Sequence, residues 1–520
     1  MTGAPAGFSS ASLARALHSS GKALYLGSDE IGPIFGTRED HLLVIGPPRS
    51  GKTSGLFAPT IACHPGPAVV VSIRDDLVRD TRSARTAIGR AFGGETAEVL
   101  LAGTVATDSS SLGWKISDGC ENWIVAKDRG VSLAHTAVPP SNGDTFWRES
   151  VSVALAGCLH GAALLGHSDN QLIANIRQAN LDVYRNSIEV LDPEGLHPSS
   201  HSFSWLYNDR VMTDNTRKSL LAVLSGQVLG GFDYQDVSRL HSVDIQEFVK
   251  GWGTLYVTVP YERKDVLSPL VTAFIEAIIG AWRHQNRPGV IARGTLLLAL
   301  DEVANIAPLP SLPGIVTTGA GDAIQTILGL QGPSQAKTWG DQADTIMGGT
   351  SHVALFPGLR AHEYIRSLAD ASEQVIAYSP TISVSGSLPA GERFATAERL
   401  TDERRYIEQQ LAQNRNRSAQ LARLQAAVHL AAQRRRDGLW TREDDVTTPH
   451  GVLNEVMGYT DVSLDIDRRA SIEPSDITHR PKGELSLVTG AKVFFLRVQH
   501  WSLDPFWTPV LNGTIDRGHS

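Results

Sequence analysis

Short apolar runs alternate with segments of helical periodicity near the start of the chain. "HLLVI" (41–45) and "PAVVVSI" (67–73) are runs of strand-forming residues. Residues 53–62 begin a helical pattern, and "RDDLVRDTRSARTAIGRAF" (74–92) has apolar residues at helical spacing. Because alternation of strands and helices is typical of a parallel sheet, this part predicts an α/β fold with a mostly parallel central sheet.

The alternation stops near residue 100 and resumes near residue 250. Residues 100–145 are rich in Gly, Ser and Asp and predict irregular structure, whereas 145–248 are mostly helical, most clearly over 175–191 and 213–229. A helix is predicted over 267–284. Further strands are predicted at 253–260, 294–300, 323–331, 351–358 and 491–498. We therefore interpret the helical region as an all-α domain inserted into the α/β domain.

A second insertion separates the last two predicted strands. Residues 396–437 contain no Gly or Pro and are dominated by strong helix formers. The segment carries Arg404, Arg405, Arg415, Arg417, Arg423, Arg434, Arg435 and Arg436. Two interpretations stay open: a solvated helix or helical hairpin, and a basic arm that contacts DNA or a neighbouring subunit.

These patterns divide the chain into consecutive parts. The predicted parts are an N-terminal segment (1–40), a first nucleotide-binding part (41–110), the all-α domain (145–248), a second nucleotide-binding part (250–380), an arginine-rich helical insertion (385–480), and a C-terminal strand and tail (481–520).

Composition supports a globular protein of several domains. The chain has 520 residues, of which 42% are hydrophobic and 20% charged, and about 150 residues per domain predicts two to four domains. The apolar stretches 151–166 and 267–282 are shorter than the about 20 residues of a membrane span, so we expect buried core helices. The N-terminus has no apolar core typical of a secretory signal. Cys63, Cys120 and Cys158 have no metal-binding spacing, which favours a reducing cytoplasm over a disulfide framework or zinc site.

The overall charge limits how the protein can contact nucleic acid. The net charge is -8 and the isoelectric point is about 6.1. A protein that binds DNA over its whole surface is usually basic. Any contact with DNA must therefore use a local patch, the lining of a pore, or a partner.

The segment Gly46–Thr53, "GPPRSGKT", has the G-x-x-x-x-G-K-[ST] pattern of a phosphate-binding loop between a strand and a helix. Backbone N–H groups at such a helix N-terminus converge on phosphate oxygens. Lys52 can bridge the β- and γ-phosphates, and the Thr53 hydroxyl can bind Mg²⁺. The predicted ligands of ATP and Mg²⁺ are Gly46, Pro47, Pro48, Arg49, Ser50, Gly51, Lys52, Thr53 and Ser54. The role of Arg49, an additional cation in the loop, stays open.

Two acidic residues end a later apolar strand. "TLLLAL" delivers Asp301 and Glu302 to the edge at which ligands bind in open α/β sheets. We expect Asp301 to hold Mg²⁺ through water and Glu302 to orient and deprotonate the attacking water. Gln331, at the end of "IQTILGLQ", is either a γ-phosphate sensor or an ordinary turn residue, and Gln335 is a weaker candidate for the same role. The predicted catalytic set is thus Lys52, Glu302 and Gln331.

These landmarks, in this order, resemble the VirD4/TraG/TraD coupling proteins, the ATPases of bacterial conjugation and type IV secretion. "VIGPPRSGKTSGLFAPTI", "DTFWRES", "GTLYVTVP" and "LLLALDEVANIAPLPSLPGIV" carry the resemblance, which covers most of 24–380 and is nearest to the actinobacterial branch. The resemblance implies a RecA-like P-loop ATPase with an inserted all-α domain that faces DNA or a relaxase. It also implies a homo-hexameric ring with ATP between subunits, which passes DNA or a DNA–protein substrate to a secretion channel.

The chain departs from the family pattern at three places. Family members usually begin with transmembrane helices, and their absence from this sequence predicts a cytoplasmic motor. Two alternatives stay open: a soluble paralogue, and a motor that docks at the inner face of the membrane through a separate subunit. The segment "VTTGAGDAIQ" lacks the arginine that some members donate to a neighbour, so we take Arg360 as a substitute. Without such a cation we expect hydrolysis to be slow or to depend on a partner. "SIRDDLVRDT" replaces a "DPKGE"-like segment, and we expect Arg74, Asp75 and Asp76 to be structural or subunit-contact residues.

Three functional hypotheses follow from the sequence. The first is a DNA-translocating ATPase of the coupling-protein class. The second is another P-loop DNA pump, such as a segregation or packaging motor. The third is a nucleotide-dependent adaptor with little turnover, which the missing arginine keeps open.

Overall fold

The computed structural model describes residues 9–29, 32–101, 104–106, 111–138, 144–208, 212–230, 240–285, 294–371, 377–380, 464–467 and 474–512. The chain divides into two compact units, 1–372 with 473–520, and 373–472. In the second unit, β11 (Ala377–Pro380) pairs antiparallel with β12 (Leu464–Asp467). The helical prediction for 396–437 lies outside the described residues and stays a prediction.

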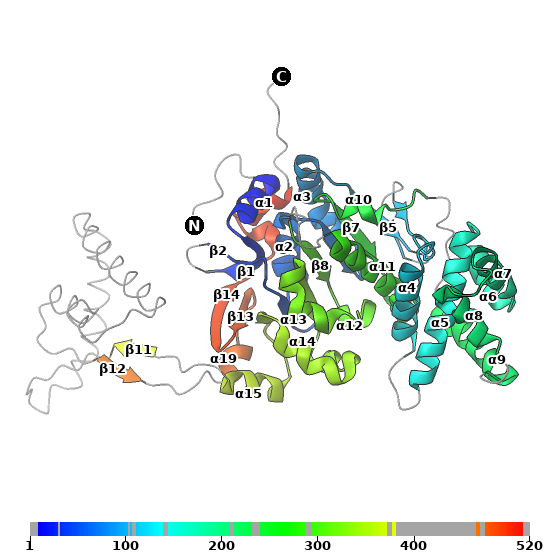
Figure 1. The fold of residues 1–520 in the computed structure, drawn as a ribbon. Helices are drawn as coiled ribbons and strands as arrows, with labels where there is room; N and C mark the ends of the chain where they lie inside the picture. The colour runs from blue at the N-terminus through cyan, green and yellow to red at the C-terminus, as the bar shows by residue number, and fades with distance from the viewer. Residues whose placement is uncertain are drawn as a thin grey trace, which may run out of the picture. The chain divides into compact units, whose positions relative to one another are not determined.

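The first unit is built on a 12-stranded sheet, most of it parallel (Figure 1). Its parallel strands are β3 (Leu42–Ile45), β4 (Ala68–Ser72), β5 (Thr96–Leu100), β6 (Leu112–Gly113), β7 (Thr254–Thr258), β8 (Leu296–Leu300), β9 (Ile324–Leu330) and β10 (His352–Leu355). They lie in the order β10-β3-β9-β8-β4-β7-β5-β6, and each neighbouring pair is parallel. The predicted α/β fold and its parallel sheet are therefore confirmed.

Antiparallel strands extend the sheet beyond β10. They are β1 (Lys22–Ser28), β2 (Pro33–Thr37), β13 (Glu484–Thr489) and β14 (Lys492–Arg497), in the order β2-β1-β14-β13-β10. The predicted strand 491–498 is β14. The sequence interpretation missed β1, β2 and β13, since it treated 1–40 only as a leading segment and expected a single strand at the C-terminus.

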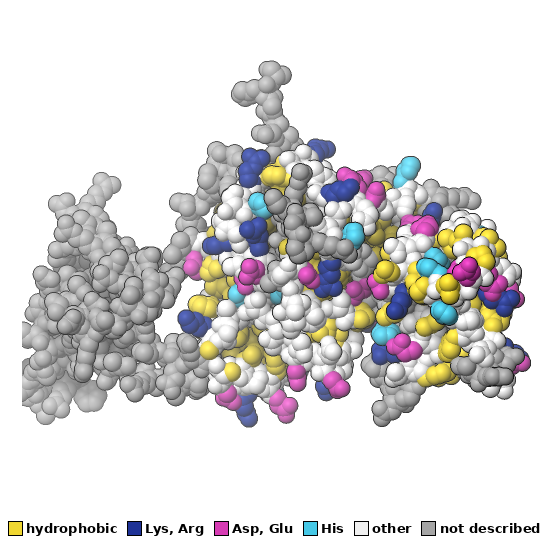
Figure 2. Space-filling model, viewed as in Figure 1, with side chains coloured by type: hydrophobic (Ala, Val, Ile, Leu, Met, Phe, Trp, Pro, Cys, Tyr) yellow, Lys and Arg dark blue, Asp and Glu magenta, His cyan; other side chains and the backbone are white. Residues whose placement is uncertain are grey.

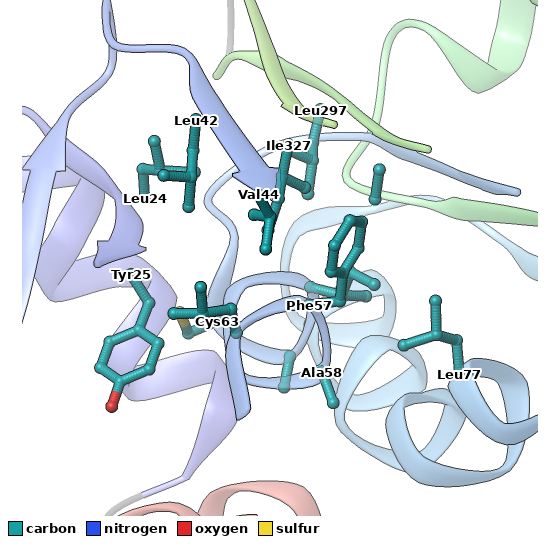
Figure 3. Packing of buried hydrophobic residues seen from close by; sticks show 14 of the residues in the cluster. Leu24, Tyr25, Leu42, Val44, Phe57, Ala58, Cys63, Leu77, Leu297 and Ile327 are labelled. Atoms are coloured by element: carbon teal, nitrogen blue, oxygen red, sulfur yellow. The ribbon is translucent and has the colours of Figure 1, made fainter. Parts of the chain in front are cut away.

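Helices from both ends of the first unit cover one face of the sheet. These are α1 (Ser10–Ser19), α2 (Ala58–Cys63), α3 (Asp76–Phe92) and α20 (Trp507–Asn512), which contact one another. Their apolar side chains form one cluster with inward residues of the parallel strands, among them Val44, Leu297 and Ile327 (Figure 3). The alternate strand residues Leu43 and Leu298 are fully buried as well. The sheet is therefore covered on both faces, as parallel sheets are.

The region between β6 and β7 is helical (Figure 1). Its longer helices are α4 (Trp123–Ala137), α5 (Asp144–Leu164), α6 (Asp169–Arg177), α7 (Asp182–Leu191), α8 (Pro198–Leu206) and α9 (Asp214–Val223). Helix α4 corrects the interpretation of 100–145 as irregular. Gly130, inside α4, lets this helix pack closely on α5, since a Cβ there would lie 2.6 Å from the Ser152 carbonyl oxygen.

One helix among the described residues, Tyr261–Gln285, has the length and hydropathy of a membrane span, but 67% of its apolar window is buried inside the protein. It contains α11 (Lys264–Gln285), which packs on α4. It therefore has the burial of a core helix, as expected for 267–282.

A buried arginine ties the covering helices to the sheet. Arg85, in α3, is fully buried, and burial lowers its pKa to about 10. Its Nε donates to Thr254 Oγ1 at 2.6 Å, its Nη1 to the His64 carbonyl at 2.7 Å and its Nη2 to the Gly66 carbonyl at 2.6 Å. The guanidinium thereby joins α3, β7 and the connection from α2 to β4.

We predict that Arg85→Ala lowers the free energy of unfolding by about 3 kcal/mol or more, because several buried carbonyl oxygens lose their donor. Arg85→Lys keeps the charge but lacks the planar fork of donors, so its free energy of unfolding should lie between those of the wild type and Arg85→Ala. Differential scanning fluorimetry measures the change in Tm. The exposed Arg90, in the same helix, is the control, and an Arg85→Ala variant as stable as Arg90→Ala would contradict the prediction.

Candidate nucleotide-binding site

The loop after β3 has the backbone of a phosphate-binding turn. Gly51 has φ 99° and Arg49 has φ 63°, both in the left-handed region. The following helix starts with a π-helical turn, η1 (Thr53–Phe57), and continues directly as α2 with helical dihedral angles at the junction, as predicted for 53–62. Gly46 packs tightly, since a Cβ there would lie 2.6 Å from Phe356 Cβ. The loop is therefore held between its own helix and the end of β10.

Lys52 and Ser50 have polar groups directed to the loop itself. Lys52 Nζ donates to the Gly46 carbonyl at 2.6 Å and the Pro47 carbonyl at 3.0 Å. Burial lowers the pKa of Lys52, and the nearby carboxylates of Asp301 and Glu302 oppose this shift. Ser50 Oγ is buried without a hydrogen-bond partner among the described residues. Within the described part of the chain, the ammonium thus donates to carbonyl oxygens and the hydroxyl is unpaired, which fits a site for an anion such as phosphate.

Thr53 is hydrogen-bonded to the acidic end of β8. Its Oγ1 donates to Asp301 Oδ2 at 3.0 Å. Loss of solvation raises the pKa of Asp301 to about 6; the Thr53 hydrogen bond and Lys52 act against the rise, whereas Glu302 and Asp76 add to it. A hydroxyl and a carboxylate in contact are oxygen ligands of the kind that Mg²⁺ takes. The structure thus brings together Thr53 and Asp301, the two predicted metal ligands.

Glu302 lies next to the predicted glutamine. Gln331 Nε2 donates to Glu302 Oε1 at 2.9 Å, and Gln335 Oε1 accepts from the Gln331 backbone N–H at 2.6 Å. Glu302 has φ 62° and ψ 44°, a left-handed conformation that is uncommon for a residue with a side chain. Because a strand places successive side chains on opposite faces, this turn redirects Glu302 at the end of β8. Gln335 therefore holds the backbone of Gln331, and the side chain of Gln331 contacts Glu302.

Sequence reasoning missed Gly329, which makes room for this arrangement. A Cβ at Gly329, in β9, would lie 2.8 Å from Asp301 Oδ1 and 3.1 Å from the Glu302 backbone nitrogen. Any side chain there would displace the acidic pair. A signal was present in the sequence, since a glycine inside a strand often marks a close approach of another group.

The remaining candidates from the sequence are Arg360 and the segment Arg74, Asp75 and Asp76. Gly358, two residues before Arg360, is close to the loop of its own chain, since a Cβ there would lie 3.6 Å from Pro47 Cγ. The Arg360 side chain is exposed. Asp76, at the start of α3, affects the charge environment of Asp301, whereas Arg74 and Asp75 are exposed. Arg360 thus follows the strand next to β3, on the phosphate-binding side of the sheet.

Comparison with solved structures identifies the fold. The unbound bacterial conjugative coupling protein TrwBdeltaN70 superposes with a TM-score of 0.58 at 15% identity, over 95% of this chain and 92% of that chain. Plasmid coupling protein TrwB in complex with ADP and Mg²⁺ gives a TM-score of 0.54 at 15% identity, over 89% and 86%. TrwB in complex with the non-hydrolysable ATP analogue ADPNP gives a TM-score of 0.53 at 15% identity, over 89% of this chain and 86% of that chain.

Two family models match the sequence. Residues 15–92 match a model described as type IV secretory system conjugative DNA transfer, and 295–405 match one described as the TraM recognition site of TraD and TraG. The resemblance to the VirD4/TraG/TraD coupling proteins is confirmed. No curated protein matches the chain. The first match ends with α3 and the second starts just before β8, so together they contain the loop, the acidic pair and Gln331 of this coupling-protein-like chain.

We predict that Gly329→Ala weakens the binding of Mg²⁺ and ATP by about tenfold or more while the protein stays folded, because the added methyl displaces Asp301. Titration with a fluorescent ATP analogue, with and without Mg²⁺, measures the effect. Gly280→Ala is a matched control, since a Cβ there meets nothing within 4 Å. Equal affinities for the two variants would show that the close approach at Gly329 has no consequence for the site.

We also predict that Mg²⁺-dependent ATP affinity falls as the pH drops below about 6. The pKa of Asp301 is raised to about 6, so the carboxyl is protonated below that pH, and a metal ligand must be deprotonated. Affinity should fall by up to about tenfold per pH unit in the acidic limit. Calorimetric titrations between pH 5 and 8 test this, with binding in EDTA as the control. A Mg²⁺-dependent affinity that is constant over this range would contradict it.

Proposed function

We propose that the protein is an ATP-hydrolysing motor of the type IV coupling-protein class, which moves DNA, or a DNA–protein substrate, toward a secretion or conjugation channel. One observation carries the enzymatic part: at the carboxyl ends of β3, β8 and β9, Thr53 is hydrogen-bonded to Asp301, and Gln331 is hydrogen-bonded to the next residue, Glu302. The two family descriptions support the transport part.

Each group at this edge has a distinct chemical role. The backbone N–H groups of Gly46–Thr53 and the Lys52 ammonium would bind phosphate oxygens, and Thr53 and Asp301 would hold Mg²⁺. Mg²⁺ bound to ATP neutralises charge on the transferred phosphoryl group. Glu302 would accept the proton of the attacking water. Gln331, already hydrogen-bonded to Glu302, would link the state of the γ-phosphate to the position of this base.

The solved relatives support a purine nucleotide with Mg²⁺ as the ligand, and the charge of the chain limits how DNA can be contacted. TrwB, which has the same fold, has been solved with ADP and Mg²⁺, with ADPNP and with the GTP analogue GDPNP. The face drawn in Figure 2 carries interspersed basic and acidic side chains. With a net charge of -8, this distribution favours contact with DNA in a channel or through a partner over binding across the whole surface.

We further propose that the protein works as a homo-hexamer in the cytoplasm. It would act at the inner face of the membrane through a separate membrane subunit, with relaxase or channel proteins as partners. The segment between β8 and β9, residues 301–323, contains no arginine or lysine. Arg360 is our candidate for the cation that a neighbouring subunit supplies, because it is exposed and follows β10 at the phosphate-binding edge.

Hydrolysis assays with and without DNA test the enzymatic part. We expect turnover that DNA stimulates, and its loss by a factor of about 10² or more in Lys52→Ala and Glu302→Gln, because each variant removes a group that acts in the transition state. Electron microscopy with ATP and DNA should show rings. Normal hydrolysis by Lys52→Ala would disprove the site, whereas nucleotide binding without turnover or rings under all these conditions would favour an adaptor.

A mixing experiment tests whether Arg360 acts between subunits. Arg360→Ala and Lys52→Ala should each be inactive alone. A mixture should regain part of the activity, because an intact loop of the first variant can meet an intact Arg360 of the second. Arg366→Ala, an exposed arginine of α15 (His362–Asp370), is the control and should stay active. If mixtures stay inactive although rings form, Arg360 is not the cation supplied in trans.

A further inference from the structure

The carboxylate of Glu302 is held by two side-chain amides from different elements. Gln331, at the end of β9, donates to Oε1 at 2.9 Å. Asn305 Nδ2 donates to Oε2 at 3.2 Å from the short helix α12 (Val303–Ile306). The Asn305 backbone N–H also donates to the Glu302 carbonyl at 2.9 Å. Each carboxylate oxygen thus has one amide partner.

This arrangement fixes the base without blocking it. A glutamate side chain can rotate about several bonds. One amide donor on each carboxylate oxygen limits this rotation and fixes the orientation of the carboxylate. An ionised carboxylate has about four lone-pair sites, so each oxygen keeps one for a water molecule.

The two amides belong to different elements, Gln331 to the end of β9 and Asn305 to α12. Gln331 belongs to the neighbouring strand, and its position relative to Glu302 depends on how β9 lies beside β8. Asn305 follows Glu302 by three residues in the same helical turn. Its contact therefore moves with Glu302 and does not depend on a shift between strands.

We propose that Asn305 is a positioning residue for the base Glu302, which keeps the carboxylate directed to the attacking water while Gln331 responds to the nucleotide. The inference rests on the proposed function. Asn305 does not contact nucleotide in this role and acts only through Glu302. No motif of the sequence had singled it out, since the role follows from the contact between the two side chains.

Steady-state kinetics of Asn305→Ala give the first test. We expect kcat for ATP to fall about tenfold, with KM and the affinity for a fluorescent ATP analogue unchanged, because the lost hydrogen bond orients the base and does not bind nucleotide. Asn305→Asp, which has the same size and no donor, should lose at least as much activity. Asn180→Ala is a matched control, since Asn180 is an exposed asparagine hydrogen-bonded to Asn175 in the helical region.

A double-mutant cycle separates positioning from a general structural effect. In a Glu302→Ala background, single-turnover measurements should show no further loss when Asn305 is also replaced, because the group through which it acts is gone. An equal loss in both backgrounds, or a rise in KM that accounts for the whole effect, overturns the inference. An unchanged kcat in Asn305→Ala also overturns it while the proposed function stands. A wild-type protein that binds ATP without turnover overturns the proposed function and this inference together.

Discussion

The hydrogen bond between Thr53 and Asp301 is the contact on which the site depends, because it joins two strands that are not neighbours. β3 delivers the phosphate-binding loop and β8 delivers the acidic pair, and β9 lies between them. The two side chains can meet only if the residue of β9 that lies between them has no bulky side chain. Gly329 satisfies this requirement, and the next residues of the strand, Leu330 and Gln331, then continue to the glutamine that contacts Glu302. One inserted strand therefore sets both the spacing of the metal ligands and the position of the base.

The rest of the first unit packs around the strands that carry this edge. The apolar cluster under the loop includes residues of α1 and α20, which come from opposite ends of the first unit. Trp507 of α20 packs against Tyr25 of β1, with ring centroids 4.7 Å apart. Arg85 fixes α3 to β7 and to the entry of β4 through neutral oxygens. The ends of the unit thus pack around the nucleotide-binding part.

The parts that the sequence predicted share a local signal. The central strands are continuous apolar runs, and the loop, Asp301, Glu302 and Gln331 follow such runs directly, so a parallel sheet places them at one edge. The missed elements have different causes. α4 lies in a region whose Gly, Ser and Asp content predicts irregular structure, and its Gly130 is needed for the approach of α5. β13 had a local signal, since it forms a hairpin with β14 in which Thr489 pairs with Lys492. Asn305 resembles any polar residue of a short helix until its contact with Glu302 is known.

Two of the four non-glycine residues with positive φ in the described part of the chain lie where the chemistry is expected. Arg49 and Glu302 both have positive φ, which costs about 1–3 kcal/mol for residues with side chains. Each follows the end of a fully buried strand, β3 or β8. Such conformations persist only where surrounding contacts determine them, and at Glu302 these contacts include hydrogen bonds from two amides. A glycine at 302 would remove the strain but also the carboxylate, so the strain is best understood as the cost of placing a base beside Asp301 at the tip of one strand.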